Sequence, residues 1–240
     1  MNGNSLTADI VPGKIPGIWA VFFDVDDTLF TFELCSAASM RYAAGRQGIT
    51  LPDRIGEVFE EVNNFLWQEL EQQRLTRAGL HAVRWQTIFA RLGIRGDPAR
   101  FEADYCAAFA ESHEQEPGAE ELIRALAQKY PLYVATNSTV KQQSNRLRNA
   151  GLLPCFRRIF ASEDVGAPKP QKAFFDACFS EMPGILPGQT ALVGDSLTAD
   201  ITGAYAYGIH TIWYDRRNTG RIVPEAEHIV RSLGEVSVFL

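Results

Sequence analysis

The fold is decided by the stretch Ala20-Val21-Phe22-Phe23-Asp24-Val25-Asp26-Asp27-Thr28-Leu29-Phe30, in which four apolar residues lead straight into carboxylates. A short continuous apolar run is typical of a strand buried on both faces of a parallel sheet. Such a strand delivers Asp24 to the carboxyl edge where open α/β sheets bind their ligands, and Asp26 is expected on the same side. Crowded carboxylates repel one another, and a hard cation such as Mg²⁺ would relieve that repulsion. Taken alone, the stretch suits a plain acidic turn equally well.

Composition places the chain among ordinary globular proteins. It has 240 residues, 46% hydrophobic and 22% charged, which allows one large domain or two modest ones. The formal net charge of −6 argues against a partner that is a nucleic-acid polymer, although a small phosphorylated metabolite can still bind to a local positive charge. The cysteines form no CxxC pair, so we expect free thiols in a reducing compartment: Cys35, Cys106, Cys155 and Cys178.

The N-terminal residues do not have the pattern of a signal peptide. Residues 1–16 are polar and rich in Gly and Pro, so we expect a loose N-terminal segment. They lack the positive and apolar regions of a signal peptide. No apolar run reaches the roughly 20 residues that a membrane helix needs. The sequence therefore predicts a cytoplasmic protein that does not bind a membrane.

The chain between positions 33 and 116 has a purely helical pattern. Thr76 is a suitable N-cap for a helix that ends at Gly93, and Asp97-Pro98 suits the start of another. No β-branched alternating run interrupts this part. Helices are expected at 34–46, from 52 to about 70, at 77–92 and from 98 to about 112. We therefore expect an all-helical cap, residues 33–116, inserted directly after the first strand.

From position 117 onward, predicted helices and strands alternate. Helices are expected at 118–129, 140–150, 171–180, 199–206 and 233–240, and strands at 132–135, 158–161, 190–193, 209–213 and 228–230. This alternation is typical of an α/β fold with a mostly parallel, Rossmann-like sheet. Because the first strand belongs to the same sheet, the predicted core is discontinuous and joins residues 17–32 to 117–240.

Two further predicted strand ends carry polar groups. Thr136-Asn137-Ser138 offers a hydroxyl and main-chain N–H groups at the start of a helix, which suits an anion, although helix capping explains it equally well. Lys169 lies in Gly166-Ala167-Pro168-Lys169-Pro170, where two prolines stiffen the loop. An exposed turn lysine is the simpler explanation for any single Lys, but this chain has few lysines.

A third predicted strand ends in Gly194-Asp195-Ser196, with Asp200 one helical turn later. A carboxylate at a helix N-terminus is stabilised by the helix dipole, and this explains either residue singly. It does not explain both together with Asp24 and Asp26.

These four motifs, in this order and each at a predicted strand end, resemble those of the haloacid-dehalogenase superfamily. The resemblance covers the chain from about Ile18 onward. It implies a Rossmann-like core with a cap inserted after the first strand, and the helical insertion resembles the type with a bundle-like cap.

The resemblance also implies roles for individual residues. In the superfamily's phosphatases the first Asp of the DxD motif is the nucleophile, which matches Asp24, and the second is the general acid/base, which matches Asp26. We expect an aspartyl-phosphate on Asp24, with Mg²⁺ held by Asp24, the Asp26 carbonyl and Asp195.

Other matched positions would support this chemistry. Lys169, Thr136 and Asn137 would hold the phosphoryl oxygens. Asp200 would orient Lys169 or a metal-bound water, and Thr28 and Ser196 are expected to be supporting residues.

Two branches of the superfamily fit less well. The dehalogenase branch lacks an Asp at the position of Asp26, and the phosphonatase branch needs a cap lysine, whereas residues 33–115 contain none. A non-catalytic binding module is the competing class. It is disfavoured because every expected catalytic position is filled.

The cap sequence bears on the substrate. The run Val62-Asn63-Asn64-Phe65-Leu66-Trp67, with Thr76 and Arg84 and with Phe30-Thr31-Phe32, resembles the pyrimidine 5′-nucleotidase subgroup. Phe65 and Leu66 are expected in the core, whereas Asn63 or Asn64, Trp67 and Arg84 are candidates to contact a base. A phosphatase acting on sugar phosphates, or a phosphoglucomutase-type phosphotransferase, remains the alternative.

Overall fold

The computed structural model describes residues 13–240, so residues 1–12 of the predicted loose segment lie outside the described part. The described part of that segment is not loose. The buried Ile15 donates its main-chain N–H to Phe239 O at 2.9 Å, and Lys14 Nζ donates to Leu240 O at 2.8 Å. These contacts form because the last helix, α10 (Val236–Phe239), leaves its final carbonyl groups without partners in the helix.

The core is a six-stranded parallel sheet. Its strand order is β3-β2-β1-β4-β5-β6, and every neighbouring pair is parallel. The strands are β1 (Ala20–Phe23), β2 (Leu132–Thr136), β3 (Phe156–Ala161), β4 (Thr190–Gly194), β5 (His210–Tyr214) and β6 (His228–Val230). The order reverses at β1, which lies between β2 and β4. This topological switch point is where doubly wound sheets place their ligands.

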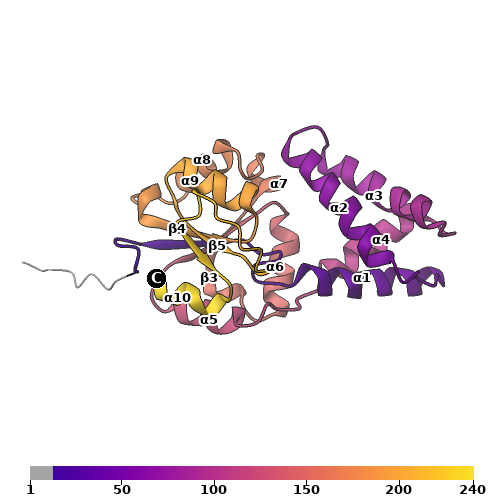
Figure 1. The fold of residues 1–240 in the computed structure, drawn as a ribbon, viewed down its shortest axis with the longest axis horizontal. Coiled ribbons are helices and arrows are strands. Elements are labelled where there is room, and N and C mark those ends of the chain that lie inside the picture. The colour runs from indigo at the N-terminus through magenta and orange to yellow at the C-terminus, as the bar shows by residue number, and fades with distance from the viewer. Residues whose placement is uncertain (1–12) are drawn as a thin grey trace, which may run out of the picture.

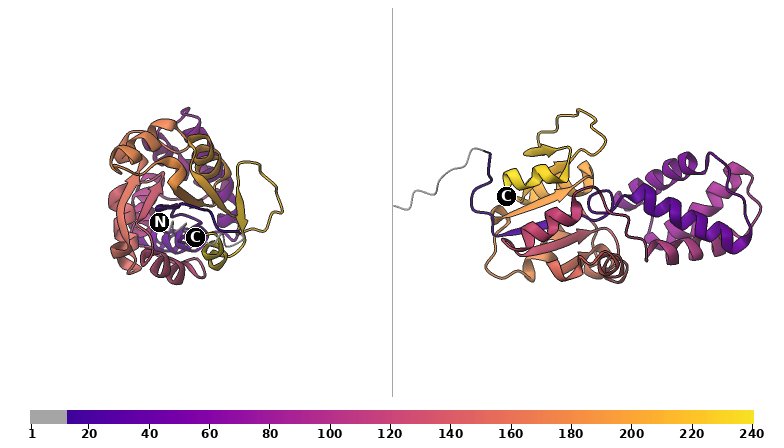
Figure 2. Two further views of the ribbon diagram at one scale, coloured as in Figure 1. Left: turned by 90° about the vertical axis from the view of Figure 1, so that its left-hand side faces the viewer. Right: turned by 90° about the horizontal axis from the view of Figure 1, so that it is seen from below.

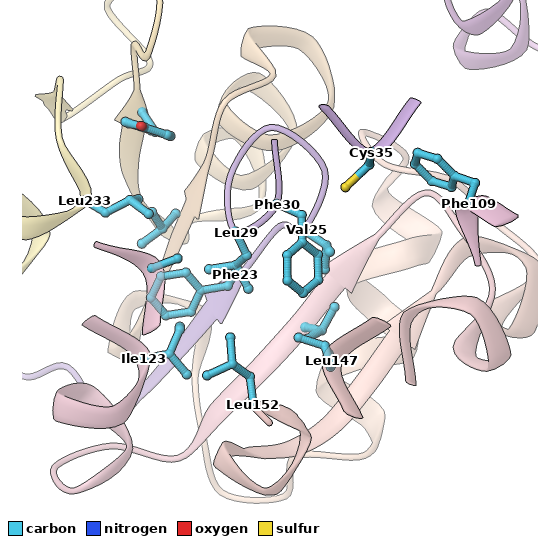
Figure 3. Close-up of a cluster of buried hydrophobic side chains, with 14 of the residues drawn as sticks. Phe23, Val25, Leu29, Phe30, Cys35, Phe109, Ile123, Leu147, Leu152 and Leu233 are labelled. Atoms are coloured by element: carbon cyan, nitrogen blue, oxygen red, sulfur yellow. The ribbon is translucent and has the colours of Figure 1, made fainter. Parts of the chain in front are cut away.

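Helices cover both faces of the sheet (Figure 1). One side carries α5 (Ala119–Ala127), α6 (Val140–Asn149) and α10, and the other carries α8 (Lys172–Ser180) and α9 (Gly203–Tyr207). The β1 side chains alternate accordingly, with Val21 and Phe23 in one buried cluster and Ala20 and Phe22 in the other. The first cluster continues past β1 through Val25 to Phe30 and reaches Phe109 in the helical insertion (Figure 3).

The first four helices after β1 stand to one side of the sheet (Figures 1 and 2). They are α1 (Phe32–Gln47), α2 (Ile55–Glu71), α3 (Arg77–Leu92) and α4 (Pro98–Phe109). The starts of α3 and α4 follow local rules, since Thr76 accepts from Gly79 N, and Asp97 accepts from Ala99 N just before a proline at the first helical position. We propose residues 33–116 as the cap and 17–32 with 117–240 as the core.

The cap helices have a common aromatic core. Trp85 on α3 stacks on Phe59 of α2 at 5.5 Å between ring centroids and lies 4.3 Å from Phe101 of α4. Phe65, expected in this core, is 59% exposed, whereas Leu66 is buried. On an α-helix, adjacent residues point about 100° apart, so the face that buries Val62 and Leu66 leaves Phe65 outside.

The remaining elements differ from expectation mainly around the site. A short helix, α7 (Ser162–Val165), follows β3, where the sequence analysis assigned no element. The helix expected at 199–206 is split into a π-helical segment, η3 (Leu197–Thr202), and α9. The 3₁₀ turns are η1 (Leu153–Cys155), η2 (Pro187–Gln189) and η4 (Leu233–Glu235). In the part of the chain that the structure describes, no helix combines the length and apolarity required to cross a membrane.

Candidate active site

A single buried lysine joins three of the motifs at the carboxyl edge of the sheet. Lys169 Nζ donates to Asp24 Oδ1 at 2.7 Å, to Asp200 Oδ1 at 2.6 Å and to the Ala135 carbonyl at 2.5 Å. An ammonium has three protons, so all of its hydrogen bonds are used. Lys169 therefore fixes one oxygen of Asp24 and leaves the other, Oδ2, without a partner among the described residues.

Asp200 reaches this lysine because β4 ends in glycine. A Cβ at Gly194 would lie 2.3 Å from Asp200 Oδ2, so no side chain fits there. The Asp200 carboxylate also accepts from Ser196 N at 3.1 Å. Ser196 Oγ in turn caps the following segment by accepting from Ala199 N at 3.1 Å. The expected role of Asp200 in orienting Lys169 thus has direct contacts in its favour, and Ser196 lies where a supporting residue would.

Carboxylates outnumber cations at this point. Oxygens of Asp24, Asp195 and Asp200 all lie within 4.8 Å of one another, and Lys169 is the cation among them. Burial raises the pKa of Asp24 to about 8, although Lys169 acts in the opposite direction. Burial, with repulsion from Asp24 and Asp200, raises the pKa of Asp195 well above its usual range. Against the effect of burial, Asp200 and Asp24 raise the pKa of Lys169.

This donor set fits a divalent cation. The ligands are hard carboxylate oxygens, and a bound Mg²⁺ would relieve the repulsion that adds to burial in raising the pKa of Asp24 and Asp195. Asp24 and Asp195 are the residues that would hold it, and Asp200 lies within the same cluster. Thr28 Oγ1 is 3.5 Å from Asp195 Oδ1, at the limit of a hydrogen bond, which places it beside the cluster as a supporting residue.

Asp26 lines the same pocket but contacts a different element. Arg146 Nη1 donates to Asp26 Oδ1 at 2.5 Å and Gln143 Nε2 donates to Oδ2 at 3.1 Å, both from α6. The strand ends at Phe23, so the two-residue alternation that placed Asp24 and Asp26 on one side does not extend to Asp26. Arg146 is itself fully buried between the rings of Phe30 and Phe109.

The third carboxylate of the opening stretch is a structural anchor. Asp27 adopts a left-handed backbone conformation with φ of 60°, and Arg216 Nη1 donates to its Oδ1. The same oxygen accepts from the main-chain N–H of Phe32 at 3.1 Å. These contacts fix the turn that leads from the sheet into α1.

Thr136 and Asn137 both line the pocket, as expected, but the Asn137 side chain is already hydrogen-bonded within the protein. The side chain of Asn137 binds the main chain of Lys169, accepting from its N–H at 2.8 Å and donating to its carbonyl at 3.0 Å. What Asn137 can offer a phosphate is therefore its own main-chain N–H, not its amide. Thr136 Oγ1 accepts from Gln143 Nε2 at 3.3 Å, which leaves its hydroxyl proton to donate.

These groups form the floor of a pocket that the cap covers. Its cavity has a volume of about 210 Å³ and is open on one side. The cap supplies the aromatic rings of Trp67, Tyr105 and Phe109, together with polar side chains of α2, α3 and α4, and Phe32 adds a ring at the junction with the core. A cap arginine, Arg77, donates to the Asn137 carbonyl at 3.1 Å and lies over the Trp67 ring at 5.7 Å.

The cap residues proposed from sequence are distributed unevenly. Trp67 and Arg84 line the pocket, whereas Asn64 is exposed and lines a neighbouring hollow beside Asp195. Its neighbour Asn63 lines the main pocket instead. The helical rotation between adjacent residues explains this, because the face that carries Trp67 also carries Asn63, four residues earlier.

Several residues that line the pocket or contact its lining have no sequence signal strong enough to single them out. They are Arg77 and His81 on α3, Glu102 and Cys106 on α4, and Gln143 and Arg146 on α6. Arg77, His81 and Arg84 recur at helical spacing, so one polar stripe on α3 was a detectable pattern. Nothing local distinguishes Arg146 from Arg148, its exposed neighbour on the same helix.

Comparison with known families agrees with the geometry. Residues 18–208 match the model of the haloacid dehalogenase-like hydrolase family. Since that match covers most of the chain, this protein belongs to the family and is a hydrolase. The motifs that suggested the superfamily are those gathered around Lys169.

Individual relatives are consistent with this assignment. The chain is 35% identical over 219 residues to the HAD-hydrolase YfnB of Bacillus subtilis (strain 168), covering 90% of this chain and 92% of that protein. A crystal structure of YfnB bound to magnesium superimposes with a TM-score of 0.85 at 34% identity, covering 91% of this chain and 96% of that one. Pyrimidine 5′-nucleotidase PynA of Streptococcus pneumoniae is 30% identical over 196 residues, covering 81% of this chain and 83% of PynA.

Proposed function

We propose that this hydrolase is a Mg²⁺-dependent phosphatase that removes the phosphate from pyrimidine nucleoside 5′-monophosphates through an aspartyl-phosphate on Asp24. The observation that carries the proposal is the floor of the pocket, where a nucleophilic carboxylate lies beside Asp195, Asp200 and one buried lysine. The relatives support it, since PynA is named a pyrimidine 5′-nucleotidase and YfnB has been crystallised with magnesium.

The first step is an in-line attack. One oxygen of Asp24 attacks phosphorus and displaces the nucleoside, while Lys169 holds the other. The Thr136 hydroxyl and the Asn137 main-chain N–H lie on the same pocket wall and would stabilise charge on the phosphoryl oxygens. Bound Mg²⁺ would reduce the repulsion between the anionic nucleophile and the anionic substrate.

The second step restores the enzyme. Asp26 would first give a proton to the leaving alkoxide and then accept one from the water that hydrolyses the aspartyl-phosphate. Arg146 and Gln143 hold both of its carboxylate oxygens, which fixes the group within the pocket. The cap would meanwhile exclude bulk water and enclose the nucleoside against its aromatic wall.

A substrate panel tests this proposal. We expect Mg²⁺-dependent hydrolysis of p-nitrophenyl phosphate, and the highest kcat/KM for pyrimidine nucleoside monophosphates over purine nucleotides and sugar phosphates. A clear preference for a sugar phosphate would overturn the nucleotide assignment and favour the sugar-phosphate alternative. Net transfer of phosphate within a sugar phosphate, without release, would favour the mutase alternative.

A further inference from the structure

A carboxylate on the cap, separate from the proposed metal cluster, accepts hydrogen bonds from four donors. Glu102 on α4 lies against Arg84, whose Nη2 donates to Oε1 at 2.6 Å and whose Nε donates to Oε2 at 3.2 Å. The Cys106 thiol donates to Oε1 at 3.0 Å, and His81 Nδ1 lies 2.7 Å from the same oxygen. Both Arg84 and Glu102 are buried.

This arrangement determines which nitrogen of His81 carries the proton. Although burial alone would raise it, the contacts with His81 and Arg84 lower the pKa of Glu102, so its carboxyl group is ionised and only accepts hydrogen bonds. His81 must then donate from Nδ1, and the neutral ring presents Nε2 as an acceptor. His81 lines the pocket, and Nε2 has no partner among the described residues.

Arg84 also fixes the orientation of a neighbouring amide. Its Nη1 donates to Asn63 Oδ1 at 3.0 Å, so the oxygen of the amide faces Arg84 and its NH₂ group faces away. Asn63 is 3% exposed and lines the same pocket wall as His81. Within residues 13–240, its Nδ2 has no acceptor. A hydrogen-bond donor and an acceptor, both oriented by Arg84 and Glu102, therefore stand on the cap wall.

We propose that His81 and Asn63 read the edge of a ring in which an N–H adjoins a carbonyl, as in uracil and thymine, and that His81 is the residue that selects these bases over cytosine. The ring N–H would donate to His81 Nε2, while the Asn63 amide donates to the carbonyl oxygen. Cytosine carries no hydrogen on the equivalent ring nitrogen, so two acceptors would face each other. This inference rests on the proposed function and adds the identity of the base.

Charge supports a neutral ligand at this end of the pocket. Arg84 and Glu102 neutralise each other, and the Arg84 guanidinium also lies 4.8 Å from the Tyr105 ring centroid. Most of its N–H groups donate to Glu102, Cys106 and Asn63, and its charge is balanced by Glu102, so this end of the pocket has no excess positive charge to attract an anion. Trp67, Tyr105 and Phe109 provide the aromatic surface beside which a flat base would lie.

The test compares UMP with CMP at pH 8, where an ordinary imidazole is neutral. We expect kcat/KM for UMP to exceed that for CMP by about ten-fold or more, because a mispaired buried acceptor is costly. In His81→Phe the ratio falls close to one through a loss on UMP. In His81→Gln the amide N–H replaces Nδ1 and its oxygen replaces Nε2, so part of the preference returns. Taking a ratio within one preparation cancels any loss of folded enzyme.

A second histidine provides the matched control. His210 forms the same kind of pair, with Nδ1 2.6 Å from Glu227 Oε2, but it does not line the pocket. His210→Phe should leave the UMP to CMP ratio unchanged.

The outcomes separate this inference from the proposed function. If p-nitrophenyl phosphate is hydrolysed but neither nucleotide is, the proposed function fails. If both nucleotides are hydrolysed with equal kcat/KM, or if His81→Phe keeps the preference for UMP, the proposed function stands and the base-reading role of His81 is wrong.

Discussion

The two ends of the pocket use buried charge in opposite ways. At the core end, Asp24, Asp195 and Asp200 surround one lysine, so negative charge is in excess. At the cap end, Arg84 and Glu102 form a balanced pair whose remaining contacts go to neutral groups.

This difference separates the chemistry of the pocket from its selectivity. An excess of buried carboxylates is unfavourable until a cation binds, so the core end is suited to a metal and to an anionic phosphate. A balanced ion pair needs no additional counter-ion, but it orients the neutral hydrogen-bond donors and acceptors around it. The cap end is therefore suited to recognise an uncharged ring.

Removal of the nucleophile should have the largest effect. We expect Asp24→Asn to lower Mg²⁺-dependent hydrolysis of p-nitrophenyl phosphate by about 1,000-fold or more, because the amide cannot form the aspartyl-phosphate. Asp176→Asn, on an exposed aspartate paired with Lys172, is the control and should keep full activity. Substantial activity in Asp24→Asn would remove Asp24 as the nucleophile.

Neutralising a buried carboxylate should destabilise the protein at the cap end of the pocket and stabilise it at the core end. Glu102 tests the cap end. Glu102→Gln leaves the buried Arg84 without its counter-ion, which should lower the free energy of unfolding by about 3–5 kcal/mol at pH 7. The pKa of Glu102 is lowered on folding, so its contribution is present above the usual value of 4.5 and is lost as the pH falls through the folded-state pKa. In urea unfolding, wild type and variant should therefore converge in acid. A constant difference at every pH would contradict this account.

Asp195 tests the core end of the pocket. In a chelator, Asp195→Asn should stabilise the protein, because it removes a buried carboxylate whose pKa is raised by burial and by its neighbours. A raised carboxyl pKa destabilises the fold progressively as the pH rises above the usual value, so the gain should be larger at pH 8 than at pH 5. Thermal unfolding measures it.

Added metal gives the complementary measurement. Mg²⁺ at a hundred times its Kd should stabilise wild type by about 2.7 kcal/mol and Asp195→Asn far less. If the two proteins gained equally, Asp195 would not be a metal ligand.

The smallest effect concerns a single helix end. Thr76 Oγ1 accepts from Gly79 N at 3.1 Å at the start of α3, the helix that carries Arg77, His81 and Arg84. Thr76→Ala should lower the free energy of unfolding by about 1 kcal/mol, as expected for a lost N-cap, and should leave kcat for p-nitrophenyl phosphate unchanged. A change in base preference in this variant would mean that the whole α3 stripe had moved.

Much of the fold could be predicted because its signals are local. The apolar run before Asp24, the alternation after position 117 and the caps at Thr76 and Asp97 each lie within a few residues, and the strands and helices were found close to the expected positions. The parallel sheet follows from that alternation, and the hydrolase family follows from four motifs, three of which lie at the ends of β1, β2 and β4.

Contacts between residues far apart in the sequence could not be predicted. Arg146 contacts Asp26 across 120 residues, and Arg84 contacts Glu102 from a different helix. The choice between Asn63 and Asn64 depends on a 100° rotation of α2, which only packing against the other cap helices fixes.

The sequence by itself determined the order of the elements, the carboxylates and lysine at the sheet edge, and the aromatic character of the cap. Only the tertiary structure decided which charge faces which, because ion pairs and hydrogen bonds depend on distances that chain order does not set. For that reason the structure was needed to show that Lys169 uses all three of its protons in hydrogen bonds. It was also needed to show that the Asn137 amide binds the Lys169 loop and that Nδ1 of His81 faces Glu102.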